Sequence, residues 1–268
     1  VVTFLMLAKE CGAEVPDHLL LRSLRHFYRY AGRGNNPYGD NRPEVGFVDN
    51  GKNGKLAFAM AAAAALTPDG ENSLYARARD VCAIQSFYTT SFMLHGHTGG
   101  GIGEIWRSAA MGLMREKKPR QYRDFMDNRK WHYDLSRRFD GSFGILGGSG
   151  YDKEQWGVAY PLAYTIPRKT LRIAGAPRTK FSKTCPLPRQ LWGTEADNTF
   201  LSLEAVPDRD GKKQDLSKET LAEDSSMAFI RRFHGSQQPT DDEIRRYVHH
   251  QEHNIRNIAA CKALGINS

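Results

Sequence analysis

The sequence predicts an all-α fold, an α/α toroid built as a partial or complete ring of helical hairpins, with a short β or extended appendage. Three observations carry this prediction. Apolar residues recur at helical spacing through the first two thirds of the chain, glycine-rich loops interrupt them, and each loop leads into a helix of small or apolar residues. Polar helices alternate with these small-residue helices, as two nested rings require.

The first unit is a helical hairpin followed by a buried helix. Residues 2–11 form an apolar helical pattern, and residues 17–31 repeat apolar side chains at the i, i+3, i+4 spacing of an amphipathic helix. A loop over residues 32–54 then leads to residues 55–66, which are alanine-rich on every side. We therefore expect the 55–66 helix to be surrounded by its neighbours.

Two further units follow with the same order of parts. A helix over residues 73–94 precedes the loop 95–103 and a small-residue helix over residues 104–114. A polar helix over 120–138 precedes the loop 139–157 and an apolar run over 158–166, which Pro167 ends. Residues 1–175 are thus predicted to be one domain of stacked hairpins.

The pattern changes after residue 175. Residues 176–210 are rich in proline and contain a β-like stretch over 199–206, which predicts an extended or β appendage. Residues 211–268 are predicted to form a C-terminal helical pair, over 216–233 and 241–263. Thr240 and Glu243 have the spacing of a capping box at the start of the second helix, and Gly265 ends it.

The charge of the chain is concentrated in its middle. The 268 residues carry a formal net charge of +8, whereas residues 115–189 alone hold 17 basic and 7 acidic side chains, a net +10. Such a basic surface either attracts a polyanion or is simply a solvent-exposed flank beside acidic residues. No nucleic-acid-binding motif and no sheet of basic and aromatic side chains is present, so nucleic acid is disfavoured as a partner.

Other sequence features bear on context. No run of about 20 apolar residues is present, so no membrane span is predicted. The four cysteines are far apart, which favours buried free thiols over a disulfide framework. The chain opens like the interior of a helix, so we expect it to be part of a larger chain. The compartment stays unassigned, with an extracytoplasmic bacterial location as the working hypothesis.

One turn carries a resemblance to known proteins. Phe139-Asp-Gly-Ser-Phe-Gly144 resembles the turns that precede inner helices in α/α toroids, including terpenoid cyclases, prenyltransferase β-subunits and complement-like thioester domains. Together with Asn50-Gly-Lys-Asn-Gly-Lys55 and His97-Thr-Gly-Gly-Gly-Ile-Gly103, it is similar to a family of uncharacterised bacterial toroid proteins, often multidomain. The similarity spans residues 1–200 or so. Asp140 and Gly141 also suit a purely structural turn.

The toroid resemblance implies few remaining activities. The acidic motifs of squalene-type cyclases and diphosphate enzymes, the zinc set of prenyltransferases and the Cys-Gly-Glu-Gln of thioester domains are all absent. The glycan-active toroids remain, namely polysaccharide lyases and α/α-barrel glycosidases, which place their chemistry in loops at the mouth of the ring. The resemblance therefore implies a carbohydrate-active protein, and its basic surface suggests an acidic polysaccharide as the candidate partner.

Candidate site residues lie in the glycine-rich loops. Asp49, Lys52 and Asn53 precede an inner helix, where a substrate carboxylate could be neutralised. A neutral imidazole near a helix start is a suitable base, which makes His97 the candidate base. Aromatic and carboxylate side chains typical of sugar contacts follow in the third loop, namely Tyr151 as the candidate acid with Asp152 and Trp156 as substrate contacts.

Three functional interpretations stay open. A lyase would use His97 as base and Tyr151 as acid, with Lys52 or Asn53 on the uronate carboxylate. A hydrolase would use two carboxyl groups among Asp49, Asp152 and Glu154. A non-catalytic helical scaffold would instead bind a polyanion or protein through residues 115–189. No cofactor and no metal site is predicted, because His95 and His97 have no third ligand at hand, and His249 and His253 lack the H-E-x-x-H order of a zinc helix.

Overall fold

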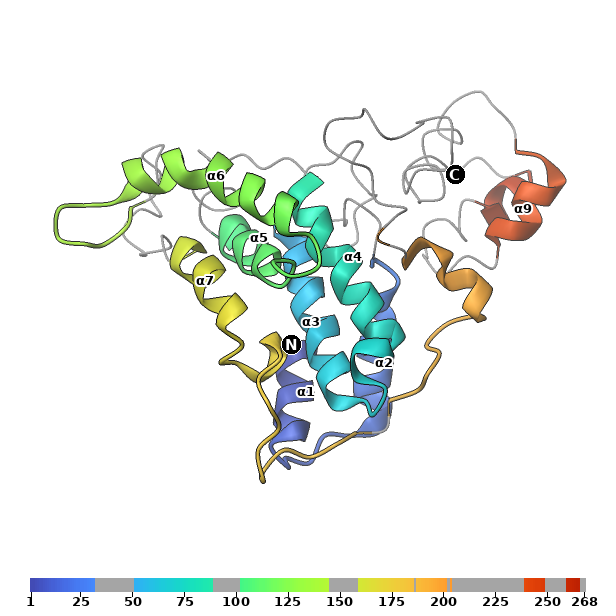
Figure 1. The fold of residues 1–268 in the computed structure, drawn as a ribbon. Helices are drawn as coiled ribbons and strands as arrows, with labels where there is room; N and C mark the ends of the chain where they lie inside the picture. Colours follow the sequence, from blue (N-terminus) through green and yellow to red (C-terminus); the bar gives the residue numbers. More distant parts are fainter. Residues whose placement is uncertain are drawn as a thin grey trace.

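The computed structural model describes residues 1–31, 51–88, 102–144, 159–185, 187–201, 203, 239–248 and 259–265. The all-α prediction is confirmed for these residues, which are mostly helical and contain no β-sheet. The longer helices among them are listed in chain order: α1 Val2–Glu10, α2 Asp17–Tyr28, α3 Lys52–Leu66, α4 Leu74–Tyr88, α5 Ile102–Gly112 and α6 Pro119–Ser136. Two shorter helices, α7 Ala159–Thr165 and α9 Asp241–Tyr247, follow (Figure 1).

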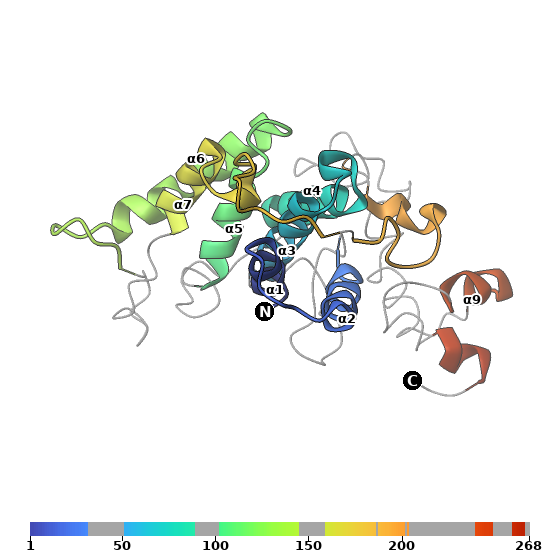
Figure 2. The ribbon, with the colours of Figure 1, turned by 90° about the horizontal axis from the view of Figure 1, so that it is seen from below.

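The helices α1, α3, α5 and α7 are neighbours in that order and run in the same direction. Where α3 and α5 begin, Gly51 lies against Gly103 and Gly54 against Trp106. Where α1 and α3 end, the Arg172 side chain bonds both Glu10 and the Ala65 carbonyl oxygen. The ends of α5 and α7 meet where Gly112 packs against Ala163 and Ile166. Figure 2 shows these helices as one group, seen from below.

The helices α2, α4 and α6 return the chain in the opposite direction. Arg107, in the first half of α5, donates a hydrogen bond to the Ser86 carbonyl near the end of α4. Arg129, in the second half of α6, reaches Glu104 at the start of α5. Helices α4 and α6 therefore end near the first half of α5. The described helices form hairpins in which α1, α3, α5 and α7 lie parallel.

The centre of the fold is α3. Nearly all of its residues are buried, and the alanines from Ala57 to Ala64 are at most 2% exposed. Small side chains let neighbouring helices approach it on every side. A β-carbon on Gly54 would lie 2.3 Å from the Trp106 carbonyl oxygen, so only glycine fits between α3 and α5 at this point. The predicted all-round burial of this helix is confirmed from Leu56 to Ala64, whereas Lys55 at its start is exposed.

The segment after residue 175 packs across the return helices, and part of its prediction is wrong. Its described residues up to 194 have no regular structure, but Glu195–Leu201 is a 3₁₀ helix, so the strand or extended stretch expected from residue 199 does not begin there. Asn198 explains the difference. Its side chain donates to Gln190 and accepts from the buried Tyr28 hydroxyl, and an extended backbone at this point would break these two hydrogen bonds. Tyr75 holds the same segment through the Pro188 carbonyl, at 2.6 Å.

The C-terminal helix begins as predicted. Thr240 and Glu243 form a capping box in which each side chain accepts the other residue's backbone N–H. The predicted helix over 216–233 lies outside the described residues, as does the middle of the predicted 241–263 helix. Residues 259–263 are helical and Gly265 follows with a positive φ of 67°, in agreement with the expected end. No helix in the described part of the chain is long and apolar enough to cross a membrane.

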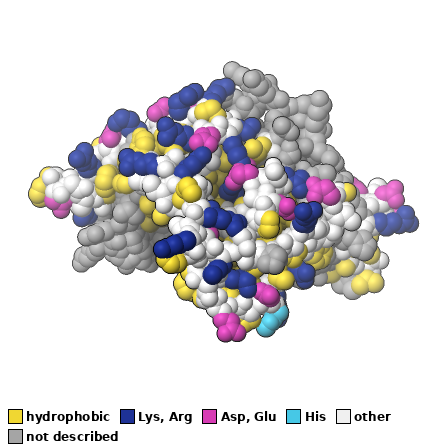
Figure 3. All heavy atoms as spheres, turned by 60° about the horizontal axis from the view of Figure 1, so that its bottom comes forward, with side chains coloured by type: hydrophobic (Ala, Val, Ile, Leu, Met, Phe, Trp, Pro, Cys, Tyr) yellow, Lys and Arg dark blue, Asp and Glu magenta, His cyan; other side chains and the backbone are white. Residues whose placement is uncertain are grey.

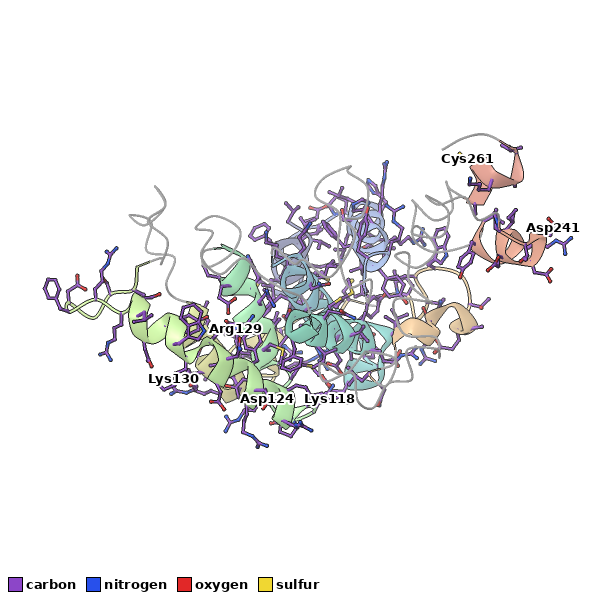
Figure 4. All side chains as sticks on the ribbon, turned by 90° about the horizontal axis from the view of Figure 1, so that it is seen from above. Lys118, Asp124, Arg129, Lys130, Asp241 and Cys261 are labelled. Carbon is purple, nitrogen blue, oxygen red and sulfur yellow. The ribbon has the colours of Figure 1, made fainter. Side chains whose placement is uncertain are left out.

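All four cysteines are free thiols, as predicted. Their expected burial is correct for Cys82 and Cys185 but wrong for Cys11, which is exposed just past the end of α1. Cys261, labelled in Figure 4, is half-buried.

Candidate functional site

A cavity of about 600 Å³ opens where α1 and α3 begin. Its walls come from α1, from the end of α2, from the first two turns of α3 and from α5. Apolar side chains make most of the lining, listed as Val1, Val2, Phe4, Leu7, Phe27, Leu56, Ala59 and Trp106. The polar side chains in the lining are Thr3, His26, Tyr30, Lys52 and Lys55.

The cationic side of this cavity is the first turn of α3. Lys52 and Lys55 lie there, and the Nζ atom of Lys52 is buried. The residue before them, Gly51, is the N-cap and has no side chain that could accept the first backbone N–H groups. The partial positive charge of those N–H groups adds to the charge of the two ammonium groups, so the beginning of α3 favours an anion.

His26 and Tyr30 face this turn from the end of α2. Arg29 donates from Nη2 to His26 Nδ1 over 2.6 Å. Because a guanidinium can only donate, Nδ1 accepts and the neutral His26 ring carries its proton on Nε2. The His26 and Tyr30 rings make an edge contact with centroids 5.5 Å apart. His26 is thus oriented as a hydrogen-bond donor beside the lysines.

Part of the cavity wall is aromatic. Trp106 packs edge-on against Phe58, with ring centroids 5.8 Å apart, and its ring also lines the cavity. Aromatic faces of this kind can stack on the apolar face of a sugar ring or hold a cation. Apolar walls also lower the local dielectric constant, which strengthens the attraction of Lys52 and Lys55 for a bound anion.

A buried polar cluster fixes the start of α5, which carries Trp106. Glu104 is fully buried, and its Oε1 accepts from Arg129 Nε at 3.0 Å, from Ser108 Oγ at 2.7 Å and from the Tyr133 hydroxyl at 3.1 Å. Burial raises the Glu104 pKa, but the positive charges of Arg129 and Arg107 and these hydrogen bonds outweigh it, so its pKa lies below the ordinary value. Burial, reinforced by the Glu104 charge, raises the pKa of Tyr133 well above the ordinary value.

Arg129 also explains why α6 lies where it does. Its guanidinium sits over the Phe125 ring, 3.8 Å from the centroid, while Nε reaches Glu104. Figure 4 shows Arg129 on the side of α6 that faces the rest of the fold and Lys130 on the outer edge. The adjacent Lys130 points outward and pairs with Asp134 at the surface. Arg129 thus makes buried contacts, whereas Lys130 is exposed to solvent.

The structure describes only part of the predicted site. Lys52 and Asn53 were expected on a turn before the helix, but α3 begins at Lys52 and includes both. Lys52 lines the cavity, whereas Asn53 is fully buried and is not part of the lining. The other predicted site residues lie outside the described residues, namely Asp49, His97, Tyr151, Asp152 and Trp156, as does Glu154.

The last described residues of the first two predicted loops lie against each other. Gly51, at the end of the first loop, would place a β-carbon 2.8 Å from the Gly103 carbonyl oxygen at the end of the second. The Asp-Gly-Ser-Phe-Gly turn follows α6, whose last turns lie against the start of α5. Asp140 Oδ1 accepts from the Ser142 backbone N–H at 2.9 Å and Gly141 has a φ of 85°, which confirms the structural reading of this turn.

Sequence reasoning missed His26, Tyr30, Lys55 and Trp106 as cavity residues. His26 and Tyr30 belong to the pattern of an amphipathic helix, which gives no hint that its last turn faces a cavity. Lys55 follows Lys52 by three residues and so shares its helix face, and this spacing was a usable signal once the helix was known to start at Lys52. Among the described residues, no three His, Cys, Asp or Glu side chains are grouped to hold a metal ion.

The first part of the chain matches a known protein family. Residues 1–175 match the model of a family described as a domain of unknown function, DUF6288. Neither a curated protein nor a solved structure shows significant similarity to the chain. The match spans more than half of the 268 residues and includes every helix that lines the cavity, so the chain belongs to the DUF6288 family.

Proposed function

We propose that the protein binds an acidic glycan in the cavity at the start of α3, as the mouth of an α/α toroid similar to the glycan-active ones. The observation that carries the proposal is the position of Lys52 and Lys55 on the first turn of α3, inside an aromatic-walled cavity of about 600 Å³. A uronate carboxylate would lie against the lysines, with the His26 Nε2–H as a further donor. The sugar ring would lie against Trp106.

The arrangement of the helices supports the toroid part of the proposal. Parallel neighbours α1, α3, α5 and α7 with antiparallel return helices form the kind of arc from which two nested rings are built. In such an arc the beginnings of the inner helices share one end. The cavity is at that end, and in the sequence the predicted site residues directly precede or begin α3, α5 and α7.

Within this proposal, lyase chemistry is the activity to test first. Lys52 would neutralise the uronate carboxylate and so make the neighbouring carbon-bound proton more acidic. His97 would take that proton and Tyr151 would protonate the leaving oxygen, which gives an unsaturated sugar end without water. These two roles rest on the sequence alone.

A binding measurement tests the proposal. Isothermal titration with a short oligogalacturonate is expected to show affinity in the wild type that falls about tenfold or more in Lys52→Met/Lys55→Met, because two charge-assisted contacts are lost. Lys130→Met, a lysine on the outer edge of α6, serves as the matched control and keeps wild-type affinity. A neutral oligosaccharide of equal length that binds as tightly as the acidic one contradicts the proposed substrate class.

The lyase step has its own readout. Incubation with polygalacturonate should release unsaturated ends, detected by ultraviolet absorbance, and both His97→Ala and Tyr151→Phe should abolish the release. Binding that persists with no release from the wild type would leave a glycan-binding protein and reject the lyase.

A further inference from the structure

The opposite end of α3 and α5 carries a second hollow surface. Two cavities of about 500 Å³ and about 290 Å³ lie there, on either side of the turn that contains Ile173 and Gly175. Both are lined by Glu71, Arg79, Ile173 and Gly175, so they adjoin and form one groove. Helix α3 has 15 residues and is about 22 Å long, and the mouth and this basic groove lie toward its two ends.

Cations outnumber carboxylates in the groove. The acidic lining residues are Glu71 and Glu116, and the basic ones are Arg79, Arg115, Lys117, Lys169, Arg172 and Arg178. Glu71 is already held by Arg79 at 2.6 Å and by Lys117 at 3.1 Å, and Glu116 by Lys169. The hydrogen bond from Arg79 lowers the Glu71 pKa to about 2, so both groups stay charged together.

Two exposed arginines remain for a ligand. Arg115 makes no ion pair with any residue that the structure describes, and Arg178 makes only a hydrogen bond from Nη2 to the Ala65 carbonyl oxygen, at 3.0 Å. Arg172 donates to the same carbonyl oxygen and pairs with Glu10. The Ala65 carbonyl oxygen therefore keeps a hydrogen-bond donor when Arg178 turns to a ligand. Arg115 lines the smaller cavity and Arg178 the larger one, which places available cations in both halves.

The uncharged residues that line the groove restrict the kinds of ligand that it can bind. Its lining contains no Phe, Tyr, Trp or His. Proteins that hold single-stranded nucleic acid stack the bases on such side chains, so this surface lacks the main contact for a nucleic acid. The lining instead combines small residues such as Gly70 and Gly112 with the hydroxyl-bearing Thr67 and Thr184. Figure 3 shows this end of the molecule, with Lys and Arg side chains spread across it.

We propose that the basic groove is a second binding site, for an acidic polysaccharide, in which Arg115 and Arg178 each hold an anionic group of one extended chain. The site is separate from the mouth and does not depend on it. A chain long enough to contact both cavities binds through several charges, so its affinity falls steeply with salt as counterions are released.

The test uses a fluorescent heparin oligosaccharide and the full chain with Lys52→Met/Lys55→Met, which removes the lysines of the mouth. Fluorescence anisotropy should still detect binding, and Arg115→Glu/Arg178→Glu in this background should weaken it about tenfold or more. Arg22→Glu/Arg245→Glu changes the net charge equally at exposed positions outside the groove and should change affinity less than about twofold.

Three results overturn the inference. The first is an equal loss in the two charge-reversed variants, which would mean that net charge alone attracts the polymer. The second is an absence of binding once the mouth lysines are removed, which would leave the mouth as the binding site and so spare the proposed function. The third is a thymidine oligonucleotide of matched charge that binds as tightly as the oligosaccharide. Unchanged thermal melting confirms that each variant is folded.

Discussion

Helix α5 meets its two neighbours through different chemistry. Against α3 the contact is backbone on backbone, since Gly51 and Gly54 lie under Gly103 and Trp106 with no room for a β-carbon. Against α6 the contact is a buried charged cluster in which Glu104 accepts from Arg129, Ser108 and Tyr133. The contact between α5 and α3 is thus limited by volume, and the contact between α5 and α6 by charge and hydrogen bonding.

The difference matters for the cavity, because α5 supplies Trp106 and α3 supplies the two lysines. The glycine contact sets how close Trp106 lies to Lys52 and Lys55. The charged cluster holds the start of α5 in register with α6. Changes in the two contacts should therefore destabilise the protein by separate routes, which the following variants test.

The largest effect is expected from Glu104→Ala. This change leaves the buried Arg129 guanidinium without its carboxylate, and breaking one side of a buried ion pair costs about 3–5 kcal/mol. Urea unfolding measures the loss. The double variant Glu104→Met/Arg129→Met removes both charges and should lie closer to the wild type than Glu104→Ala does. If Glu104→Ala loses less than about 1 kcal/mol, the cluster does not hold α5 as described.

Gly54→Ala should be next. The new methyl group would start 2.3 Å from the Trp106 carbonyl oxygen, and since backbone is in the way the two helices must separate, at about 1–3 kcal/mol. The comparison variant is Gly141→Ala, where nothing lies within 4 Å and only the positive φ of 85° is strained, at about 1 kcal/mol. Oligogalacturonate binding should weaken in Gly54→Ala alone, whereas weakening in both variants would disconnect the glycine contact from the cavity.

Tyr133→Phe isolates one hydrogen bond of the cluster. The Tyr133 hydroxyl lies 2.8 Å from Ser108 Oγ and 3.1 Å from Glu104 Oε1, and this oxygen still accepts from Ser108 and Arg129 without it. We therefore expect a loss of about 1 kcal/mol in the free energy of unfolding. Ligand binding should not change. A loss as large as that of Glu104→Ala would show that the cluster fails as a unit.

The smallest effect is acid sensitivity at the groove. The Glu71 pKa is lowered from 4.5 to about 2, chiefly by the Arg79 hydrogen bond. A lowered pKa in the folded state contributes stability above the unfolded value, which is lost as the pH falls from about 4.5 towards 2. Because the Glu71 side chain is 68% exposed, solvent and salt reduce this contribution. Glu71→Gln should flatten the decline in unfolding free energy between pH values of about 5 and 3, and an unchanged slope would contradict the pairing.

The sequence was sufficient for the helices from α1 to α7 but not for the start of α3. Gly51 and Gly54 within Asn50-Gly-Lys-Asn-Gly read as a turn, because glycine and asparagine disfavour helix interiors. In the structure Gly54 is inside the helix, where its lack of a side chain lets α5 approach. A close approach is a tertiary requirement, so local propensity could not reveal it. Because the helix begins at Lys52 rather than at Lys55, both lysines lie in its first turn.

The buried charges were also beyond sequence reasoning. Glu104, Arg107 and Arg129 look like solvated side chains, because isolated charges are rarely buried. Only their meeting in space allows the burial, and they come from α5 and α6, about 25 residues apart. The strand expected from residue 199 failed for a similar reason, since the buried Tyr28–Asn198 hydrogen bond outweighs β propensity.

The central claim is that Lys52 and Lys55 form the anion site of the mouth. Lysine acetylation footprinting by mass spectrometry tests it directly, with a short oligogalacturonate and the Arg115→Glu/Arg178→Glu variant, so that the groove does not compete. Lys55, which is exposed, should be protected several-fold by the ligand while Lys130 reacts as before. If Lys55 is acetylated at the same rate with and without bound ligand, the mouth is not the site.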